Sequence, residues 1–175
     1  MKKLTRRIIS AFYKQKKPLG KLVLLDLERS KFLNPVPKII IYLPENYDRS
    51  NAPNRVLYAL DGQNLFDEKT SYVGEWYLDD NVDELIKDRL LDNIIVVGIY
   101  NRGNLRGDDY TPAPMKEKGK MHGGNLINHA RFIIQELKPY IDKNYKTLKG
   151  REATGVMGSS LGGLASFYML GMYPD

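Results

Sequence analysis

A glycine-rich stretch most constrains what this chain can fold into. Residues 154–163 read TGVMGSSLGG and centre a Gly-x-Ser-x-Gly motif on Ser160. The apolar segment 153–157 before it predicts a strand, and helical spacing from 161 to 172 predicts a helix. Glycines two residues before and after the serine leave space where a side chain would collide with the adjoining strand or helix. The stretch therefore predicts a strand, a tight turn and a helix.

This arrangement is typical of a nucleophile elbow, where a strained backbone holds a serine hydroxyl out of the sheet. Ser160 is the candidate nucleophile. The backbone N–H of Leu161, at the start of the helix, can face a developing oxyanion. A chance match of the motif has odds of roughly one in twenty, so a glycine-rich helix start without chemistry is the alternative. The flanking strand and helix favour the nucleophile.

The composition is that of one soluble globular domain. Of 175 residues, 42% are hydrophobic and 27% are charged. The absence of cysteine excludes disulfides, thiolate zinc sites and a cysteine nucleophile. With only His122 and His129, a multi-histidine metal site is not expected.

Basic charge is concentrated at the N-terminus. Residues 1–21 carry eight Lys or Arg and no acid, and the rest of the chain carries 19 basic and 21 acidic residues. We expect residues 1–20 to form a basic, solvated arm. No aromatic residues repeat along it, so neither a nucleic-acid nor a membrane partner is expected. No apolar run is long enough for a signal peptide or a membrane span, and the expected location is the cytoplasm.

Apolar segments alternate with amphipathic ones along the chain. Strands are expected at 21–27, 38–43, 55–60, 93–100 and 153–157. Helices are expected at 78–91, 126–141 and 161–172, with Pro139 bending the second near its end. This order predicts an α/β fold with a mostly parallel sheet covered on both faces. Residues 101–120 are expected to form a long loop. In the helix expected at 126–141, His129 is predicted to lie beside the apolar stripe, as a flank residue.

Several motifs follow one another in a recognisable order. They are 42–47 (YLPENY), 60–66 (LDGQNLF), 97–99 (VGI), 137–141 (LKPYI), 158–163 (GSSLGG) and 173–175 (YPD). Together they resemble the Putative esterase family of α/β-hydrolases, with its esterase D-type, enterochelin-type and feruloyl esterases and its mycolyltransferases. The resemblance implies a three-layer α/β-hydrolase sandwich and serine esterase or thioesterase chemistry on a small-molecule ester. It implies no cofactor.

In this fold the loop after the third strand supplies the second oxyanion N–H. Here that group is the backbone amide of Gln63, because Gly62 lets the chain curl to aim it; a plain turn is the alternative. Further candidates for a substrate pocket are Asp61, Asn64, Trp76 and Arg106. Core packing is the alternative for Trp76, and an ordinary loop position is the alternative for Arg106.

The chain departs from the family after Ser160. The resemblance implies roughly another hundred residues, which carry the acid and the histidine of the triad in that order. Only fifteen residues follow Ser160, and none is histidine. We therefore expect residues 21–175 to be the N-terminal part of a truncated domain, with a sheet incomplete on its C-terminal side and with weak or no activity. A second copy or a complementing C-terminal chain is the expected partner. A catalytically inactive binding module and an acyltransferase remain alternatives.

Overall fold

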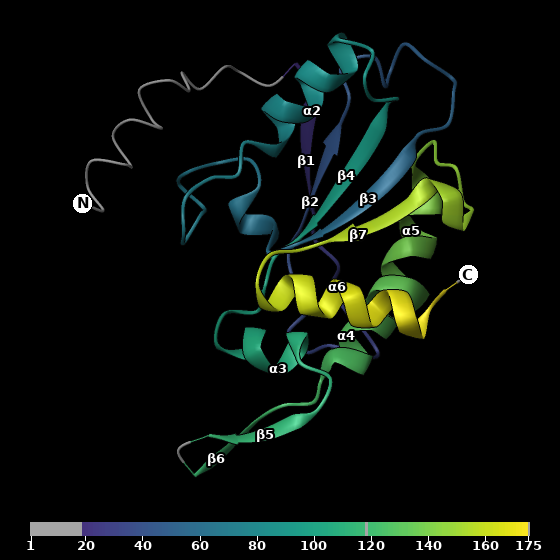
Figure 1. The fold of residues 1–175 in the computed structure, drawn as a ribbon. Coiled ribbons are helices and arrows are strands. Elements are labelled where there is room, and N and C mark those ends of the chain that lie inside the picture. Colours follow the sequence, from purple (N-terminus) through teal and green to yellow (C-terminus); the bar gives the residue numbers. More distant parts are fainter. Residues whose placement is uncertain (1–18, 118, 175) are drawn as a thin grey trace, which may run out of the picture.

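The computed structural model describes residues 19–117 and 119–174 (Figure 1). The basic arm expected at residues 1–20 lies almost entirely outside the described residues. The strands are β1 (Lys21–Leu25), β2 (Ile39–Leu43), β3 (Arg55–Leu60), β4 (Ile94–Ile99), β5 (Pro114–Glu117), β6 (Lys120–Gly123) and β7 (Thr154–Met157). The helices are α2 (Leu78–Lys87), α3 (Arg106–Tyr110), α4 (Leu126–Arg131), α5 (Lys138–Asn144) and α6 (Leu161–Met172).

Five of the described strands form one sheet in the order β1-β2-β4-β3-β7. Strand β3 pairs in parallel with both β4 and β7, whereas β2 pairs antiparallel with β1 and β4. Only β2 therefore runs against the other four strands, and the predicted mostly parallel sheet is confirmed. In the described part of the chain β7 lies at one edge of this sheet.

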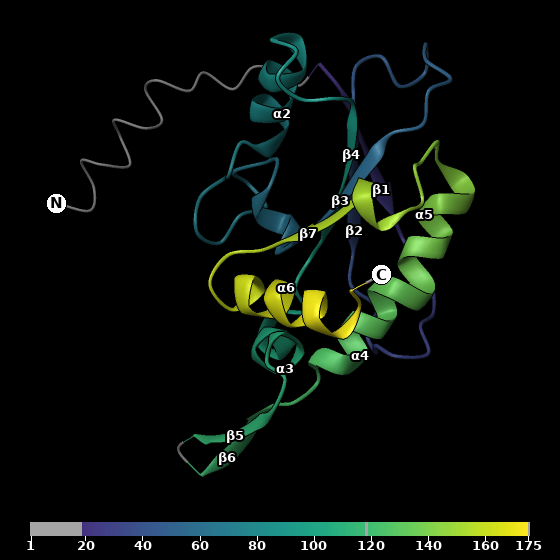
Figure 2. The same ribbon diagram turned by 45° about the vertical axis from the view of Figure 1, so that its right-hand side comes forward.

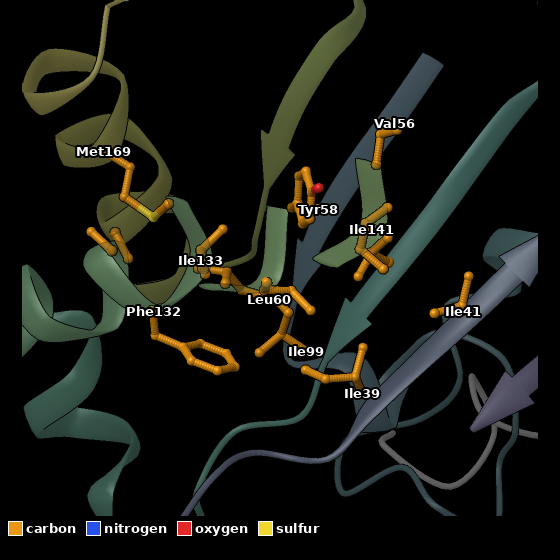
Figure 3. Packing of buried hydrophobic residues seen from close by; sticks show 14 of the residues in the cluster. Ile39, Ile41, Val56, Tyr58, Leu60, Ile99, Phe132, Ile133, Ile141 and Met169 are labelled. Atoms are coloured by element: carbon orange, nitrogen blue, oxygen red, sulfur yellow. The ribbon is translucent and has the colours of Figure 1, made fainter. Parts of the chain in front are cut away.

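Helices cover both faces of the sheet, which makes three layers (Figure 2). Successive side chains of each strand point to opposite faces of the sheet. In β2, Ile39 and Ile41 face the side where α4, α5 and α6 pack, and Tyr42 faces the side where α2 packs. Figure 3 shows the larger cluster, in which Phe132, Ile133 and Met169 from the helices meet strand residues such as Leu60 and Ile99. The burial of these apolar side chains on two faces is the main force that holds the layers together.

The helix expected at 126–141 is continuous but changes its winding. Between α4 and α5 lies a π-helical segment, Phe132–Leu137, and the N–H of Lys138 donates to the carbonyl of Ile133. Pro139 follows immediately, as the second residue of α5. Because proline has no N–H and its ring collides with the carbonyl four residues earlier, the wider turn accommodates it.

The expectation of a plain loop at 101–120 was wrong. The segment contains α3 and the whole of β5, and the antiparallel hairpin β5–β6 projects away from the sheet (Figure 1). Its strands are only four residues long, and the methionine that each carries, Met115 and Met121, is exposed, so they lack the apolar alternation that reveals a buried strand. Helix α2 also ends at Lys87, four residues before the expected end. Among the described helices, none has the length and apolarity needed to cross a membrane.

Candidate active site

Ser160 lies at the tip of a sharp turn between β7 and α6. Its backbone angles, φ 56° and ψ −121°, lie outside the regions that non-glycine residues normally occupy, and its side chain is exposed. Such a conformation costs about 1–3 kcal/mol and persists only where the surrounding fold enforces it. Part of that enforcement comes from Gly158, where an added Cβ would lie 2.5 Å from the carbonyl of Gly162. The strand and the helix therefore meet too closely for any other residue at position 158.

Helix α6 begins immediately after the serine. The N–H groups of Gly162 and Leu164 donate to the carbonyls of Ser159 and Ser160, at 2.9 and 3.1 Å. Among the described residues the N–H of Leu161 has no hydrogen-bond acceptor. An unsatisfied N–H in the first turn of a twelve-residue helix, where the helix dipole is positive, is suited to an anionic oxygen.

A second N–H without an acceptor follows β3. Asp61 has left-handed backbone angles, φ 59° and ψ 45°, and Gly62–Asn64 then form one 3₁₀ turn, in which the N–H of Asn64 donates to the carbonyl of Asp61 at 2.9 Å. No acceptor for the Gln63 N–H lies within the described part of the chain. Gly62 is required there because an added Cβ would lie 2.6 Å from the backbone of Gly98 in β4.

The carboxylate of Asp61 is buried and fully hydrogen-bonded. Arg106 donates to it from Nε and Nη2, both at 2.7 Å, and Asn101 donates from Nδ2 at 2.7 Å. The backbone N–H of Asp61 donates to the hydroxyl of the buried Tyr110 at 3.1 Å. The bond to Asp61 also raises the pKa of the Arg106 guanidinium, against a smaller opposing effect of burial.

Asp61 and Arg106, two candidates for the substrate pocket, therefore bind each other, and Arg106 also reaches the carbonyl of Ser159 at 3.5 Å. Asn64 is buried, and its Oδ1 accepts hydrogen bonds from the hydroxyl of Ser71 and the N–H of Tyr72. Trp76 packs against the cluster on the α2 face of the sheet. Contact of these four residues with a substrate stays a prediction.

The expectation that His129 is a flank residue was wrong, because its side chain is fully buried. It packs edge-to-face on Tyr110, with ring centroids 5.3 Å apart, and neither ring nitrogen has a hydrogen-bond partner in the described structure. Burial lowers its pKa to about 4. Helix α3 packs on the side of α4 that carries His129, and a contact between two such segments has no signal in local spacing.

No described hydrogen bond joins an imidazole to Ser160. His122 lies on β6, in the exposed hairpin, and His129 is enclosed in the core while the serine is exposed. The described residues also contain no cluster of three or more His, Asp or Glu side chains able to hold a metal ion. Among the described residues, no imidazole is therefore hydrogen-bonded to Ser160, the candidate nucleophile.

A groove lies between β7, α6 and the π-helical segment. Its volume is about 560 Å³, and residues of β7, of α6 and of the π-helical segment line it, among them Val156, Phe167 and Ile133. Several apolar residues of α6 are exposed, including Phe167 at 73% and Leu170 at 61%. An edge strand beside an uncovered apolar helix face is a surface that proteins normally cover.

The chain is similar in sequence and fold to several known proteins. The family model described as Putative esterase matches residues 30–175. An IroE-like serine hydrolase from Shewanella oneidensis is 26% identical, with a TM-score of 0.67 over 86% of this chain and 46% of that one. Siderophore hydrolase EstA from Aspergillus nidulans has a TM-score of 0.69 at 19% identity, over 93% of this chain and 57% of its own. The Bacillus subtilis protein YbbA, described as uncharacterized, is 24% identical over 79% of this chain and 52% of its own. The chain thus spans about half the length of these relatives.

Proposed function

Because the chain belongs to the Putative esterase family of α/β-hydrolases, we propose that it is the nucleophile-bearing part of a serine ester hydrolase. The observation that carries the proposal is the backbone of Ser160, whose positive φ exposes its hydroxyl at the junction of β7 and α6. A fold tolerates that strain most often at functional sites. The N–H groups of Leu161 and Gln63 lack acceptors in the described structure, which supports their assignment as the oxyanion hole.

The chemistry would be acyl transfer in two steps. The Ser160 oxygen attacks the carbonyl carbon of the ester while a base removes the hydroxyl proton, and the two N–H groups stabilise the tetrahedral oxyanion. Collapse of that intermediate breaks the bond to the alcohol, which leaves with the proton. Water then attacks the acyl-serine by the same route and releases the acid.

The base must come from outside the described residues. His129 is buried and its pKa is near 4, so it is neither accessible nor a strong base. Parallel strands end at the same edge of a sheet, so a strand added in parallel to β7 would end beside Ser160. The loop after such a strand could bring an imidazole to the serine. The partner proposed is accordingly a complementing C-terminal polypeptide that pairs with β7 and covers the apolar face of α6.

The test is hydrolysis of p-nitrophenyl acetate by the 175-residue chain, with the Ser160→Ala variant as the blank. Loss of the base from a serine triad typically lowers turnover by a factor on the order of a million, so little Ser160-dependent hydrolysis is expected from the chain alone. Added imidazole, a diffusible base, should raise the rate of the parent protein above that of the variant. Equal rates at every imidazole concentration would contradict the proposed nucleophile. Fast turnover without imidazole would contradict the missing base.

A catalytically inactive binding module is the second candidate, and the uncovered apolar face of α6 favours it. The two candidates differ in what Ser160 contributes. If binding is the only function, Ser160→Ala leaves partner binding unchanged, and the parent protein reacts with a phosphonate that mimics an ester no faster than the variant.

A further inference from the structure

Two loops carry the proposed oxyanion hole, and one guanidinium contacts both. Arg106 binds the carboxylate of Asp61, at the start of the turn that carries the Gln63 N–H. The same Nη2 atom donates to the carbonyl of Ser159, next to the serine, at 3.5 Å. The Asp61 carboxylate itself lies against the first turn of α6, since a Cβ on Gly162 would be 3.4 Å from its Oδ2.

Tyr110 and Asn101 help to hold the Arg106 guanidinium and the Asp61 turn in place. The guanidinium carbon lies 5.0 Å from the centre of the Tyr110 ring, and the hydroxyl of the same ring accepts the N–H of Asp61. Asn101 reaches the same turn twice, because its Nδ2 donates to Asp61 and its backbone N–H donates to Oε1 of Gln63. Arg106 therefore belongs to a packed network and keeps only 28% of its side chain exposed.

The charge of the pair has a chemical consequence. The side chain of Asp61 is 3% exposed and lies against the helix end where the oxyanion would form. A buried carboxylate there would repel a second negative charge, and the low local dielectric would strengthen that repulsion. The two hydrogen bonds from Arg106 neutralise the carboxylate and hold its orientation.

We propose that Arg106 is a positioning residue for the proposed ester hydrolysis: it fixes the Asp61 turn against the Ser160 elbow and neutralises Asp61 where the oxyanion forms. It acts through Asp61 and the Ser159 carbonyl and does not itself contact the reacting atoms. This role rests on the proposed function.

The experiment measures the rate at which a neutral p-nitrophenyl alkylphosphonate modifies Ser160 in the presence of imidazole, per folded molecule. Phosphonylation builds negative charge on an oxygen, as ester attack does. For Arg106→Gln we expect a rate roughly 100-fold lower, comparable to the loss of one oxyanion donor. Arg106→Lys, which keeps the charge but loses the two-pronged geometry, should fall between that variant and the parent.

A double variant separates electrostatics from folding. In Asp61→Asn/Arg106→Gln no unpaired carboxylate remains, so the rate should recover at least tenfold over Arg106→Gln. The matched control is Arg102→Gln, because Arg102 makes a similar two-pronged pair with Asp109, at 2.8 and 2.5 Å, with both side chains almost fully buried. That variant should be destabilised but should keep the parent rate.

The outcomes distinguish the two proposals. An unmodified parent protein would overturn the proposed function together with this role. A parent protein modified at Ser160 with Arg106→Gln equally fast would overturn the role of Arg106 alone. If Arg102→Gln slowed the modification of Ser160 equally, or if the double variant did not recover the rate, Arg106 would have a merely structural role. Either result would also overturn the proposed positioning role.

Discussion

His129 illustrates how a single residue can make folding depend on pH. Its ring is fully buried beside Tyr110, and burial lowers its pKa from 6.5 to about 4. The folded protein therefore disfavours the protonated ring, whereas the unfolded chain accepts the proton at its ordinary pKa. As pH falls from about 6.5 towards 4, protons bind preferentially to the unfolded state and stability is lost.

The first prediction compares the parent protein with His129→Phe, which keeps an aromatic ring against Tyr110. Between pH 7 and pH 4 the parent should lose up to about 3 kcal/mol more unfolding free energy than the variant, because each pKa unit is worth about 1.36 kcal/mol. Urea denaturation at several pH values measures this. Other titrating groups are common to both proteins and cancel in the difference. Parallel pH profiles would show that His129 is not the group responsible.

The buried partners of the candidate site had no signal in the local sequence. Ser160 and Gln63 could be predicted as candidates because strand–turn–helix and strand–turn patterns are local. The pairing of Asp61 with Arg106, and the burial of His129 under Tyr110, depend on how α3 packs against α4 and the β3 turn. An αL residue such as Asp61 could have been suspected from its Asp-Gly sequence, since Asp tolerates that conformation better than most residues.

At the scale of elements, β7 and α6 depend on one close approach. Gly158 has no room for a Cβ, which would lie 2.5 Å from the Gly162 carbonyl, whereas Gly171 near the end of the same helix has no atom within 4 Å of that position. A glycine-to-alanine substitution therefore meets a crowded environment at Gly158 and an open one at Gly171.

The second prediction is that Gly158→Ala and Gly171→Ala change stability in opposite directions. Gly158→Ala should lower the unfolding free energy by more than about 3 kcal/mol, because strand or helix must move to admit the methyl group. Gly171→Ala should raise it by about 0.5–1 kcal/mol, because alanine favours the helix and restricts the unfolded chain. Chemical denaturation measures both. A stable Gly158→Ala protein would mean that the elbow is not built on this contact.

The open edge of β7 and the exposed face of α6 give a third prediction. Without a covering partner, the chain should associate with itself at rising concentration, because unpaired strand edges and apolar faces pair readily. Phe167→Lys with Leu170→Glu should reduce that association. Tyr72→Lys is the control, since Tyr72 is 76% exposed on a loop outside the groove.

Sedimentation velocity over a range of concentrations tests this prediction. The parent protein and Tyr72→Lys should both sediment faster as concentration rises, while the double variant should stay close to the monomer. Unchanged association in the double variant would place the contact on another surface.

At the scale of the whole molecule, the layered architecture could be predicted from the sequence, but the hairpin and the order of the strands could not. Strands β2, β3 and β4 are nearly continuous apolar runs, as strands covered on both faces require, so the sheet could be anticipated. The hairpin β5–β6 could not, because its apolar residues Met115 and Met121 are exposed and contribute nothing to the core. The order of the strands also came only from the structure, since pairing between distant segments leaves no local pattern.

The proposed ester hydrolysis requires the hydroxyl oxygen of Ser160 to act as the nucleophile, and Ser159 provides a matched neighbour. Both serines are exposed, but only Ser160 has the positive φ of the elbow. The most direct measurement is peptide mapping by mass spectrometry after reaction with a fluorophosphonate in the presence of imidazole. We predict one adduct per chain, on Ser160, which persists in Ser159→Ala and disappears in Ser160→Ala. An adduct on Ser159, or the same labelling in Ser160→Ala, would contradict the assignment of the nucleophile.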